Sequence, residues 1–297
     1  MQIEHIAADN DDVATIRIEG LERDLKILQL TDSHMAVGDE RDPDAAEHVA
    51  RLRESFQQRT PGGVSAREVF DQALKRGAQE EIDAAVLTGD ITHLPTFAAI
   101  EIIQQGLKEL SVPSLYTLGN HDWHLSHLES SEATRSDYYP RFHGLTGGSP
   151  SHQVLELGGV RLITLDNSTY QVNAEQLAFL RQQLAVGQPC LLFVHIPLWV
   201  ESLMPAVVEM WNAPIVMAPA SGWTDESRVR WEKVLDPSPS TRECMELLST
   251  GPSENVAGIF CGHVHFSHVD EYREGRCQYV TAPGFSGGYR VIQLEGG

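Results

Sequence analysis

Five short apolar runs in this chain each end abruptly in polar residues of the types that bind metal ions. The run at 25–30 is followed by Thr-Asp-Ser-His, the run at 84–87 by Thr-Gly-Asp, and the run at 114–118 by Gly-Asn-His-Asp. Two later runs, at 190–194 and 256–260, are followed by a histidine and by Cys-Gly-His-Val-His. Such runs are typical of buried strands, and α/β folds bind ligands beyond the carboxyl ends of their strands. The pattern therefore predicts one polar site where the strands end.

Helical patterns alternate with these strands. Apolar side chains recur at helical spacing in four segments, which are 64–80, 96–110, 174–185 and 241–249. A Gly-Gly pair between the apolar runs at 154–157 and 160–165 predicts a hairpin, and the C-terminal part is typical of antiparallel strands ending at 289–294. Strand–helix units followed by hairpins predict an α/β protein with a mixed sheet layered by helices.

Two segments interrupt the alternation, and we interpret both as insertions in a single domain spanning 1–297. The segment 35–63 is polar and contains several Gly and Pro residues, which predicts a loop that could cover the site. The segment 198–239 contains four tryptophans and fits no regular period, so we expect it to be partly helical. It could form a substrate lid or an oligomer contact, or it could pack as an ordinary insertion. We expect a loop at 126–150.

The charge and cysteine content exclude several classes of protein. With 42 acidic and 22 basic residues the formal net charge is −20, which disfavours long nucleic acids and anionic membranes as partners. No apolar run approaches the ~20 residues of a membrane span, and the acidic start does not resemble a signal peptide, so we expect a cytoplasmic protein. The four cysteines form no CxxC pair and are expected to be reduced, with a Cys261–Cys277 disulfide as the alternative.

Taken together and in this order, the motifs D-x-H, G-D, G-N-H-D, a strand-terminal His and G-H-x-H resemble those of the calcineurin-like metallophosphoesterases. Their pattern is most similar to the bacterial class III cyclic-nucleotide and glycerophosphodiester phosphodiesterases. The resemblance runs from Asp32 to His265 and rests on the motifs alone. It implies a four-layer α/β/β/α sandwich of two mixed β-sheets flanked by helices, with two metal ions at the strand ends.

The resemblance also implies two ion-binding groups joined by one bridging carboxylate. The first would comprise Asp32, His34 and His265, the second Asn120, His195 and His263, and Asp90 would bridge them. Carboxylate and imidazole ligands suit Mn, Fe or Zn, whereas the absence of thiolates argues against a structural zinc site. A metal-bridging hydroxide would attack the phosphorus, so no covalent phospho-enzyme is needed.

His121 occupies the family position of the histidine beside the leaving group, which implies a general acid or a transition-state stabiliser. Asp122 either orients His121 or accepts backbone hydrogen bonds in its turn, and both roles stay open. Gly89 and Gly119 are expected to permit close backbone turns beneath the ligands.

Three further histidines lie near the motifs: His93, His124 and His127. His93 and His124 are candidates for lining the substrate site, and His93 also for the outer shell of the first ion. The alternative for all three is an ordinary loop position or a hydrogen-bonded histidine. Three aromatic residues could stack on a base or fill the core, namely Tyr170, Phe285 and Tyr289.

Residues Ile91 to Leu94 lack both the V-D-R-G pattern of the protein phosphatases and the tyrosine of the purple acid phosphatases. We therefore expect neither a phosphoprotein substrate nor a tyrosinate-bound ferric ion. The predicted function is metal-dependent hydrolysis of a small phosphorylated molecule by a phosphodiesterase or a phosphatase, and homo-oligomers are left open. The alternative is a non-catalytic scaffold of the same fold, which would be expected to have lost some of the seven ligand residues, and none is missing.

Overall fold

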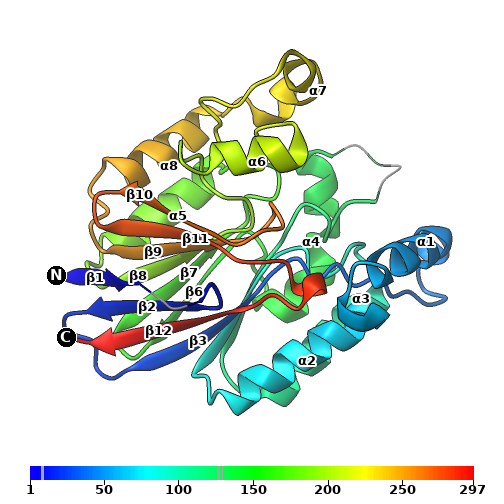
Figure 1. Cartoon of the computed structure of the whole chain (residues 1–297), viewed down its shortest axis with the longest axis horizontal. Coiled ribbons are helices and arrows are strands. Elements are labelled where there is room, and N and C mark those ends of the chain that lie inside the picture. The colour runs from blue at the N-terminus through cyan, green and yellow to red at the C-terminus, as the bar shows by residue number, and fades with distance from the viewer. Residues whose placement is uncertain (8–9, 126–127, 129) are drawn as a thin grey trace.

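Two six-stranded β-sheets pack face to face in the computed structural model, which describes residues 1–7, 10–125, 128 and 130–297 (Figure 1). The first sheet has the order β1 (Ile3–Ile6), β2 (Val13–Ile18), β12 (Arg290–Gly296), β3 (Leu25–Leu30), β4 (Ala84–Thr88) and β5 (Ser114–Thr117). The second has the order β10 (His268–Arg273), β11 (Arg276–Val280), β9 (Val256–Cys261), β8 (Cys190–Phe193), β7 (Val160–Leu165) and β6 (His152–Leu157).

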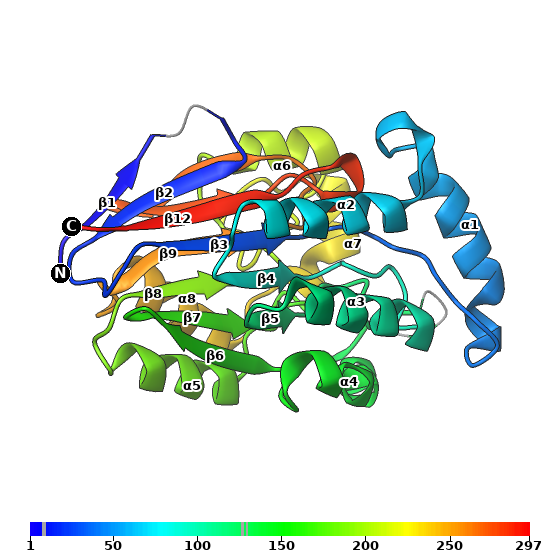
Figure 2. The same ribbon diagram turned by 90° about the horizontal axis from the view of Figure 1, so that it is seen from below.

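Both sheets are mixed, and their parallel strands position the site. Strands β3, β4 and β5 are parallel to one another, and so are β7, β8, β9 and β11. The strands β10 and β6, at the two edges of the second sheet, pair antiparallel with their neighbours. The loops that follow the parallel strands of both sheets therefore lie at the same end of the sandwich, to the right in Figure 2.

Strand alternation divides the apolar residues between two environments. On β3, Leu25 and Ile27 point into the core between the sheets, while Leu28 and Leu30 pack against the helices outside the first sheet. The helices of this outer layer are α2 (Ala66–Gln79), α3 (Phe97–Leu110) and α4 (Glu132–Thr146). The second sheet is covered mainly by α5 (Ala174–Leu184), α6 (Met204–Trp211) and α8 (Pro239–Ser249). The predicted four-layer α/β/β/α sandwich is confirmed.

The helices predicted at 64–80, 96–110, 174–185 and 241–249 are confirmed as α2, α3, α5 and α8. Their first residues explain where they begin. Ser65 and Asn173 form capping boxes at α2 and α5, and Thr96 accepts a hydrogen bond from Ala99 N at α3. These side chains satisfy backbone N–H groups that would otherwise lack partners.

The loop predicted at 126–150 is wrong over most of its length, because residues 132–146 form α4. Pro140 and Gly144 lie within this helix, and both are poor helix formers, so the sequence does not indicate a helix here. Tertiary contacts outweigh this propensity: Phe142 is fully buried and stacks on Tyr116, and Arg135 is buried against Asp166. Strands β1 and β2 also lie in an N-terminal region for which the sequence predicted no element.

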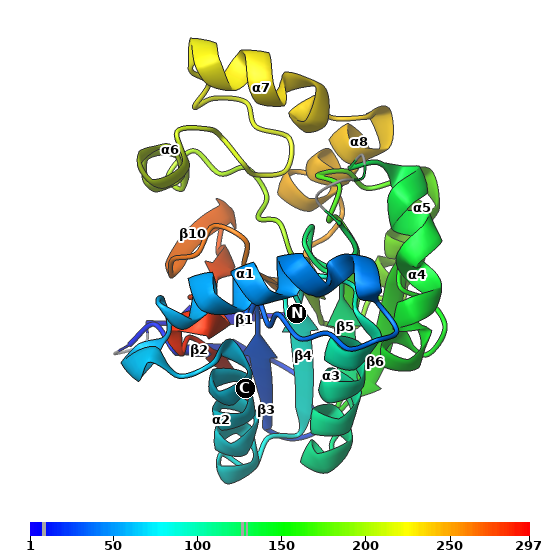
Figure 3. The ribbon, with the colours of Figure 1, turned by 90° about the vertical axis from the view of Figure 1, so that its right-hand side faces the viewer.

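The two segments interpreted as insertions both contain helices. Residues 35–63 hold the 3-10 turns η1 (Pro43–Ala45) and η2 (Pro61–Gly63) on either side of α1 (Ala46–Gln57), which crosses the strand ends of the first sheet in Figure 3. Residues 198–239 contain α6 and α7 (Asp225–Leu235), so the prediction of partly helical structure is confirmed.

All four cysteines are free, and three of them are buried, so the predicted thiols are confirmed and the alternative Cys261–Cys277 disulfide is not formed.

Across the part of the chain that the structure describes, none of the helices combines the length and the apolar content needed to cross a bilayer.

Candidate metal centre

Backbone hydrogen bonds tie together the loops that follow the parallel strands. Asp32 N donates to Gly89 O at 3.0 Å and His34 N donates to Asp90 O at 2.8 Å, which joins the loops after β3 and β4. In the second sheet, Gly262 N donates to His195 O at 3.0 Å and joins the loops after β8 and β9. The polar residues predicted at separate strand ends are thus held in fixed register with one another.

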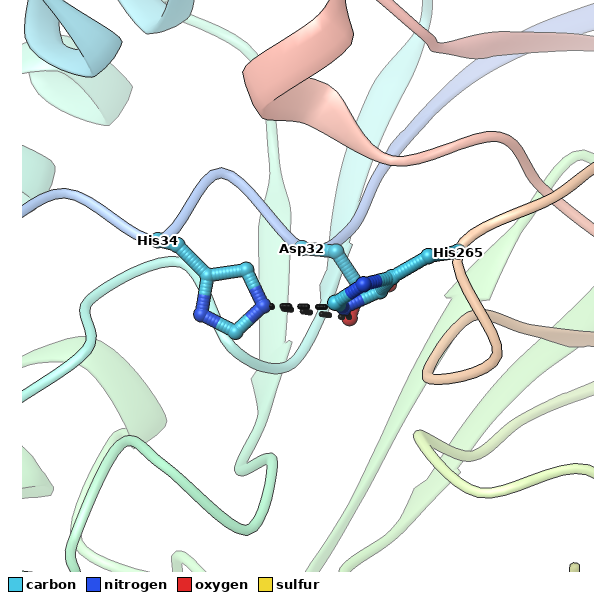
Figure 4. A group of neighbouring side chains, drawn as sticks. All are labelled: Asp32, His34 and His265. Atoms are coloured by element: carbon cyan, nitrogen blue, oxygen red, sulfur yellow. Dashed lines mark hydrogen bonds and ion pairs between the residues drawn. The ribbon is translucent and has the colours of Figure 1, made fainter. Parts of the chain in front are cut away.

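Asp32, His34 and His265 form the first candidate ion-binding group, with donor atoms within 4.8 Å of one another (Figure 4). Asp32 Oδ2 accepts hydrogen bonds from Thr31 Oγ1 at 2.7 Å and from His263 N at 2.8 Å. Asp32 Oδ1 is buried without a hydrogen bond of good geometry, 3.3 Å from His265 Nε2 and 3.7 Å from His34 Nε2.

The two Nε2 atoms of this first group lie only 3.1 Å apart, so both ring nitrogens and the unbonded carboxylate oxygen face one point. Three lone-pair donors that converge in this way repel one another unless a positive charge lies between them. The group therefore fits a cation.

Asp90, His195 and His263 form the second candidate group, again within 4.8 Å. His195 Nδ1 must carry a proton, because it contacts the Thr88 carbonyl oxygen at 2.8 Å, and this leaves Nε2 to face Asp90 Oδ2 at 3.2 Å. Asn120, predicted to complete the group, has a buried Oδ1 without a hydrogen bond. A buried oxygen without a partner is costly in the absence of a cation or water.

Asp90 lies between the two groups. Its Oδ1 accepts a hydrogen bond from His121 N at 2.7 Å. Its Oδ2 lies 3.2 Å from His195 Nε2 in the second group and 3.8 Å from His34 Nε2 in the first. This is the placement that a carboxylate needs in order to bridge two ions.

Five of the seven predicted ligands adopt a positive φ, which is uncommon for residues other than glycine. The angles are 49° for Asp32, 47° for His34, 51° for Asp90, 72° for His263 and 62° for His265. Each such residue costs on the order of 1–3 kcal/mol and persists only where its surroundings enforce it. These backbone conformations therefore lower the stability of the fold, and they direct the five side chains toward the site.

Glycines make the close approach of the loops feasible. A Cβ at Gly89, whose φ is 86°, would lie 2.7 Å from His195 Nδ1 and 2.5 Å from Gly119 N. A Cβ at Gly119 would overlap the Asp90 carboxylate, and one at Gly262 would overlap Thr31 and Asp32. The predicted need for glycine at 89 and 119 is confirmed.

Burial and mutual charge set the protonation of the site. Burial lowers the pKa of His34 well below its usual value and, together with the nearby His195, lowers that of His263 to about 3. Burial also opposes the charged form of His195, but the attraction of Asp90 outweighs it and raises the His195 pKa to about 10. The Asp90 pKa is lowered despite burial, chiefly by His195 and His121. His34 and His263 are thus neutral and Asp90 is ionised, which are the states that bind metal ions, whereas His195 would have to release its Nε2 proton in order to bind one.

Asp122 organises the turns beneath the site. Its carboxylate accepts hydrogen bonds from Asp90 N at 2.9 Å, Gly119 N at 2.7 Å, Thr92 N at 3.0 Å and Tyr116 Oη at 2.9 Å. These bonds use both carboxylate oxygens and are the ones that the turn-organising alternative requires.

The neighbouring histidines differ in their placement. The ring of His121 stacks on His93 at 4.1 Å between centroids, and His93 Nδ1 lies 2.8 Å from His34 Nδ1, so both rings adjoin the first group. His124 Nε2 contacts Leu128 O at 3.0 Å within its own loop, as an ordinary hydrogen-bonded histidine would. His127 lies outside the described residues.

The loop after β7 contributes Asn167, which the sequence analysis missed, and Tyr170, for which it predicted base stacking or core packing. Asn167 accepts hydrogen bonds from His195 N at 3.1 Å and Ile196 N at 3.0 Å and donates to Ile196 O at 2.7 Å. Tyr170 Oη lies 3.1 Å from His263 Nε2. The signal was the same as for the predicted ligands, since polar residues follow the apolar run at 160–165.

Aromatic side chains surround the first group. Phe56 stacks on His34 with centroids 4.7 Å apart, and both Phe285 and Trp211 approach the edge or face of His265 at 5.2 Å. Phe56 belongs to the segment 35–63, which was predicted to cover the site. The stacking of Phe56 on His34 confirms this prediction at one of the candidate ligands. Tyr289, by contrast, packs in the helix-side core of the first sheet.

A sequence model described as calcineurin-like phosphoesterase matches residues 25–267, which is most of the chain. The chain belongs to this family. The calcineurin-like phosphoesterase is thus an enzyme of the dinuclear, metal-dependent class that hydrolyses phosphate esters, and its two candidate ion-binding groups match that class.

Among curated proteins, this phosphoesterase is 24% identical over 310 residues to a 3′,5′-cyclic adenosine monophosphate phosphodiesterase of Escherichia coli K12, covering 96% of this chain and 90% of that one. It is 26% identical over 259 residues to a probable cyclic nucleotide phosphodiesterase of Fibrobacter succinogenes, covering 86% and 78%. Among solved structures, a dimetal phosphatase from Danio rerio superposes with a TM-score of 0.52 at 12% identity, covering 88% of each chain, which shows a shared fold.

Proposed function

We propose that this protein is a phosphodiesterase that hydrolyses small phosphodiesters of the cyclic-nucleotide type. The observation that carries the proposal is Asp90 Oδ2, which lies 3.2 Å from a histidine of one group and 3.8 Å from a histidine of the other. The names of the two bacterial relatives, both cyclic nucleotide phosphodiesterases, support a cyclic nucleotide as substrate. The net charge of −20 supports a small substrate over a long nucleic acid.

The residues present fit two divalent ions, and Mn, Fe and Zn suit their nitrogen and oxygen donors. Asp32, His34 and His265 would hold one ion and Asn120, His195 and His263 the other, with Asp90 shared between them. Bound ions of this kind lower the pKa of water and neutralise the charge of the phosphoryl oxygens. Thr31 and the His263 backbone amide hydrogen-bond one oxygen of Asp32, so its other oxygen would be left to bind an ion.

His121 is proposed to donate a proton to the leaving oxygen. Its backbone amide is fixed by Asp90 Oδ1, and its ring is packed against His93 and against the edge of His34, with centroids 5.3 Å apart in the latter pair. A partly buried imidazole held next to the reacting phosphate can transfer a proton without diffusing away. Asp122 would act as a positioning residue, because its bonds fix the backbone of Asp90 and Gly119.

The test is turnover of cyclic nucleotides, glycerophosphodiesters and nucleotide monoesters by protein loaded with Mn²⁺, Zn²⁺ or Fe. We expect the diesters to be preferred, and Asp90→Asn to lower kcat/KM by at least ~1000-fold, because the bridging charge contributes several kcal/mol. Asp71→Asn, at a half-buried carboxylate of α2 outside the site, is the charge-matched control. Undiminished turnover by Asp90→Asn would remove the assignment, and a preference for monoesters would redirect it to a phosphatase.

In the same series, His121→Ala should lose more activity on esters with poor leaving groups than on aryl esters, since poor leaving groups need the proton most. Both ions should remain bound in this variant. An equal loss across the leaving-group series would show that His121 is not the proton donor.

A further inference from the structure

We propose that Arg59, lying over Phe56 and Phe285, forms a subsite for an anionic group that the substrate carries outside its scissile phosphate. The inference rests on the proposed function, because it assigns specificity to the same hydrolytic site. The chemical class is a carboxylate or a second phosphate.

The geometry places this cation at the rim of the candidate metal centre. The guanidinium carbon of Arg59 lies 4.9 Å from the ring centroid of Phe285 and 5.3 Å from that of Phe56. Phe285 in turn contacts His265, and Phe56 stacks on His34. One layer of aromatic rings therefore separates the guanidinium from two predicted ligands of the first ion.

The charge of Arg59 is not compensated within the described part of the chain, where its side chain makes neither a hydrogen bond nor an ion pair. Two other arginines, by contrast, are paired with acids: Arg41 bonds Asp39 and Glu101, and Arg141 bonds Asp42. The chain has a net charge of −20, so acidic partners for an arginine are abundant. Arg59 is exposed beside the site and pairs with none of the acids that the structure describes, which leaves its positive charge available to an anionic ligand.

Stacking on two rings orients the guanidinium without using its N–H groups. The attraction between a cation and the faces of aromatic rings holds the planar group in place. Its N–H donors then remain free for an oxyanion in the forked arrangement that suits carboxylate and phosphate. Phe56 and Phe285 are themselves buried, at 5% and 6% exposure, so the support beneath Arg59 is rigid.

Local structure fixes the position of this platform. Arg59 follows α1, and its backbone N donates to Phe56 O at 2.8 Å. Phe285 lies in the turn η3 (Gly284–Ser286) and donates its backbone N to Asp32 O at 3.0 Å. Both supports are thus tied to the loops that carry the predicted ligands, so the distance from Arg59 to the scissile phosphate is set by the fold.

The experiment measures binding of two phosphonates by calorimetry on the metal-loaded protein. 2-Carboxyethylphosphonate and propylphosphonate share the phosphonate group, resist hydrolysis and differ in the distal carboxylate. We expect the wild type to bind the carboxylate compound about fivefold more tightly, which is the scale of an exposed ion pair. Arg59→Gln should bring the two Kd values to within about twofold, and Arg59→Lys should keep part of the difference, since lysine retains the charge but not the fork.

Arg76→Gln is the matched control. Arg76 also lies over an aromatic ring, 4.6 Å from the centroid of Tyr289, but near the C-terminal end of α2, away from the strand ends that carry the site. It should keep the wild-type preference. Equal Kd values for the two phosphonates in the wild type, no measurable binding of either, or a preference that survives in Arg59→Gln would overturn the subsite. Failure of the proposed function would show separately, as an absence of turnover alongside an intact Arg59-dependent preference.

Discussion

The two candidate ion-binding groups are supported in different ways. In the second group, hydrogen bonds from the protein interior fix the histidines: His195 donates to the Thr88 carbonyl, and His263 contacts the Tyr170 hydroxyl. In the first group, His34 Nδ1 contacts His93 Nδ1, but most of the support is aromatic packing, since Phe56 covers His34 and both Phe285 and Trp211 flank His265. Hydrogen bonds fix the orientation of a ring, whereas packing confines it more loosely.

We expect the two groups to differ in how tightly they bind their ions. The second group is tied to the buried polar residues of the loop after β7, and we expect it to hold its ion more tightly. The first group is partly exposed at His265, whose side chain is 12% accessible, and lies beside the rim where substrate would enter. Three substitutions test this difference between the two groups.

The largest effect is expected at Arg135, which is buried and forms an ion pair with the buried Asp166 at 3.2 Å, at the base of the loop that carries Asn167 and Tyr170. Arg135→Ala leaves the Asp166 charge unpaired, so the free energy of unfolding should fall by about 3–5 kcal/mol. Urea denaturation measures it. Arg181→Ala, which breaks the exposed pair with Glu243, should change the free energy of unfolding by less than about 1 kcal/mol. Similar losses in the two variants would mean that the buried pair is not what anchors this loop.

A smaller effect is expected from Tyr170→Phe, which removes only the hydroxyl that contacts His263. Loss of a hydrogen bond that orients a metal-binding histidine typically weakens ion binding by about 10–100-fold. Competition with a chelator should show the loss for one ion and not for the other. Tyr272→Phe, whose hydroxyl contacts Val256 O far from the site, is the control. Unaltered affinity for both ions would contradict the orienting role.

The smallest effect is expected from Phe56→Leu, which removes the ring stacked on His34. An aromatic pair contributes about 0.5–1.5 kcal/mol beyond its buried area, so one ion should bind about two- to tenfold more weakly. This loss should be smaller than that of Tyr170→Phe and should concern the other ion. Phe179→Leu removes a comparable ring contact, with His152, outside the site. If Phe56→Leu weakened ion binding more than Tyr170→Phe, the ranking of the two groups would be reversed.

The strand-end motifs were predictable from the sequence because each is local. An apolar run followed by Asp, Asn or His marks a buried strand and its polar end within a few residues, and the order of the motifs then indicates the family. The helical spacing of apolar residues likewise predicted α2, α3, α5 and α8. It failed at α4, where Pro140 and Gly144 lower the helix propensity and burial of Phe142 and Arg135 restores the helix.

The residues that orient the ligands and line the rim were decided by the tertiary structure. Tyr170 meets His263 across 93 positions of the chain, and Arg59 meets Phe285 from a distant part of the sequence. The sequence by itself determined which side chains can bind ions, because ligand chemistry belongs to the residue type. Which atoms face the ions, and which residues hold them there, depended on how two sheets pack, because hydrogen bonds and ring contacts exist only once distant segments are brought within a few ångströms.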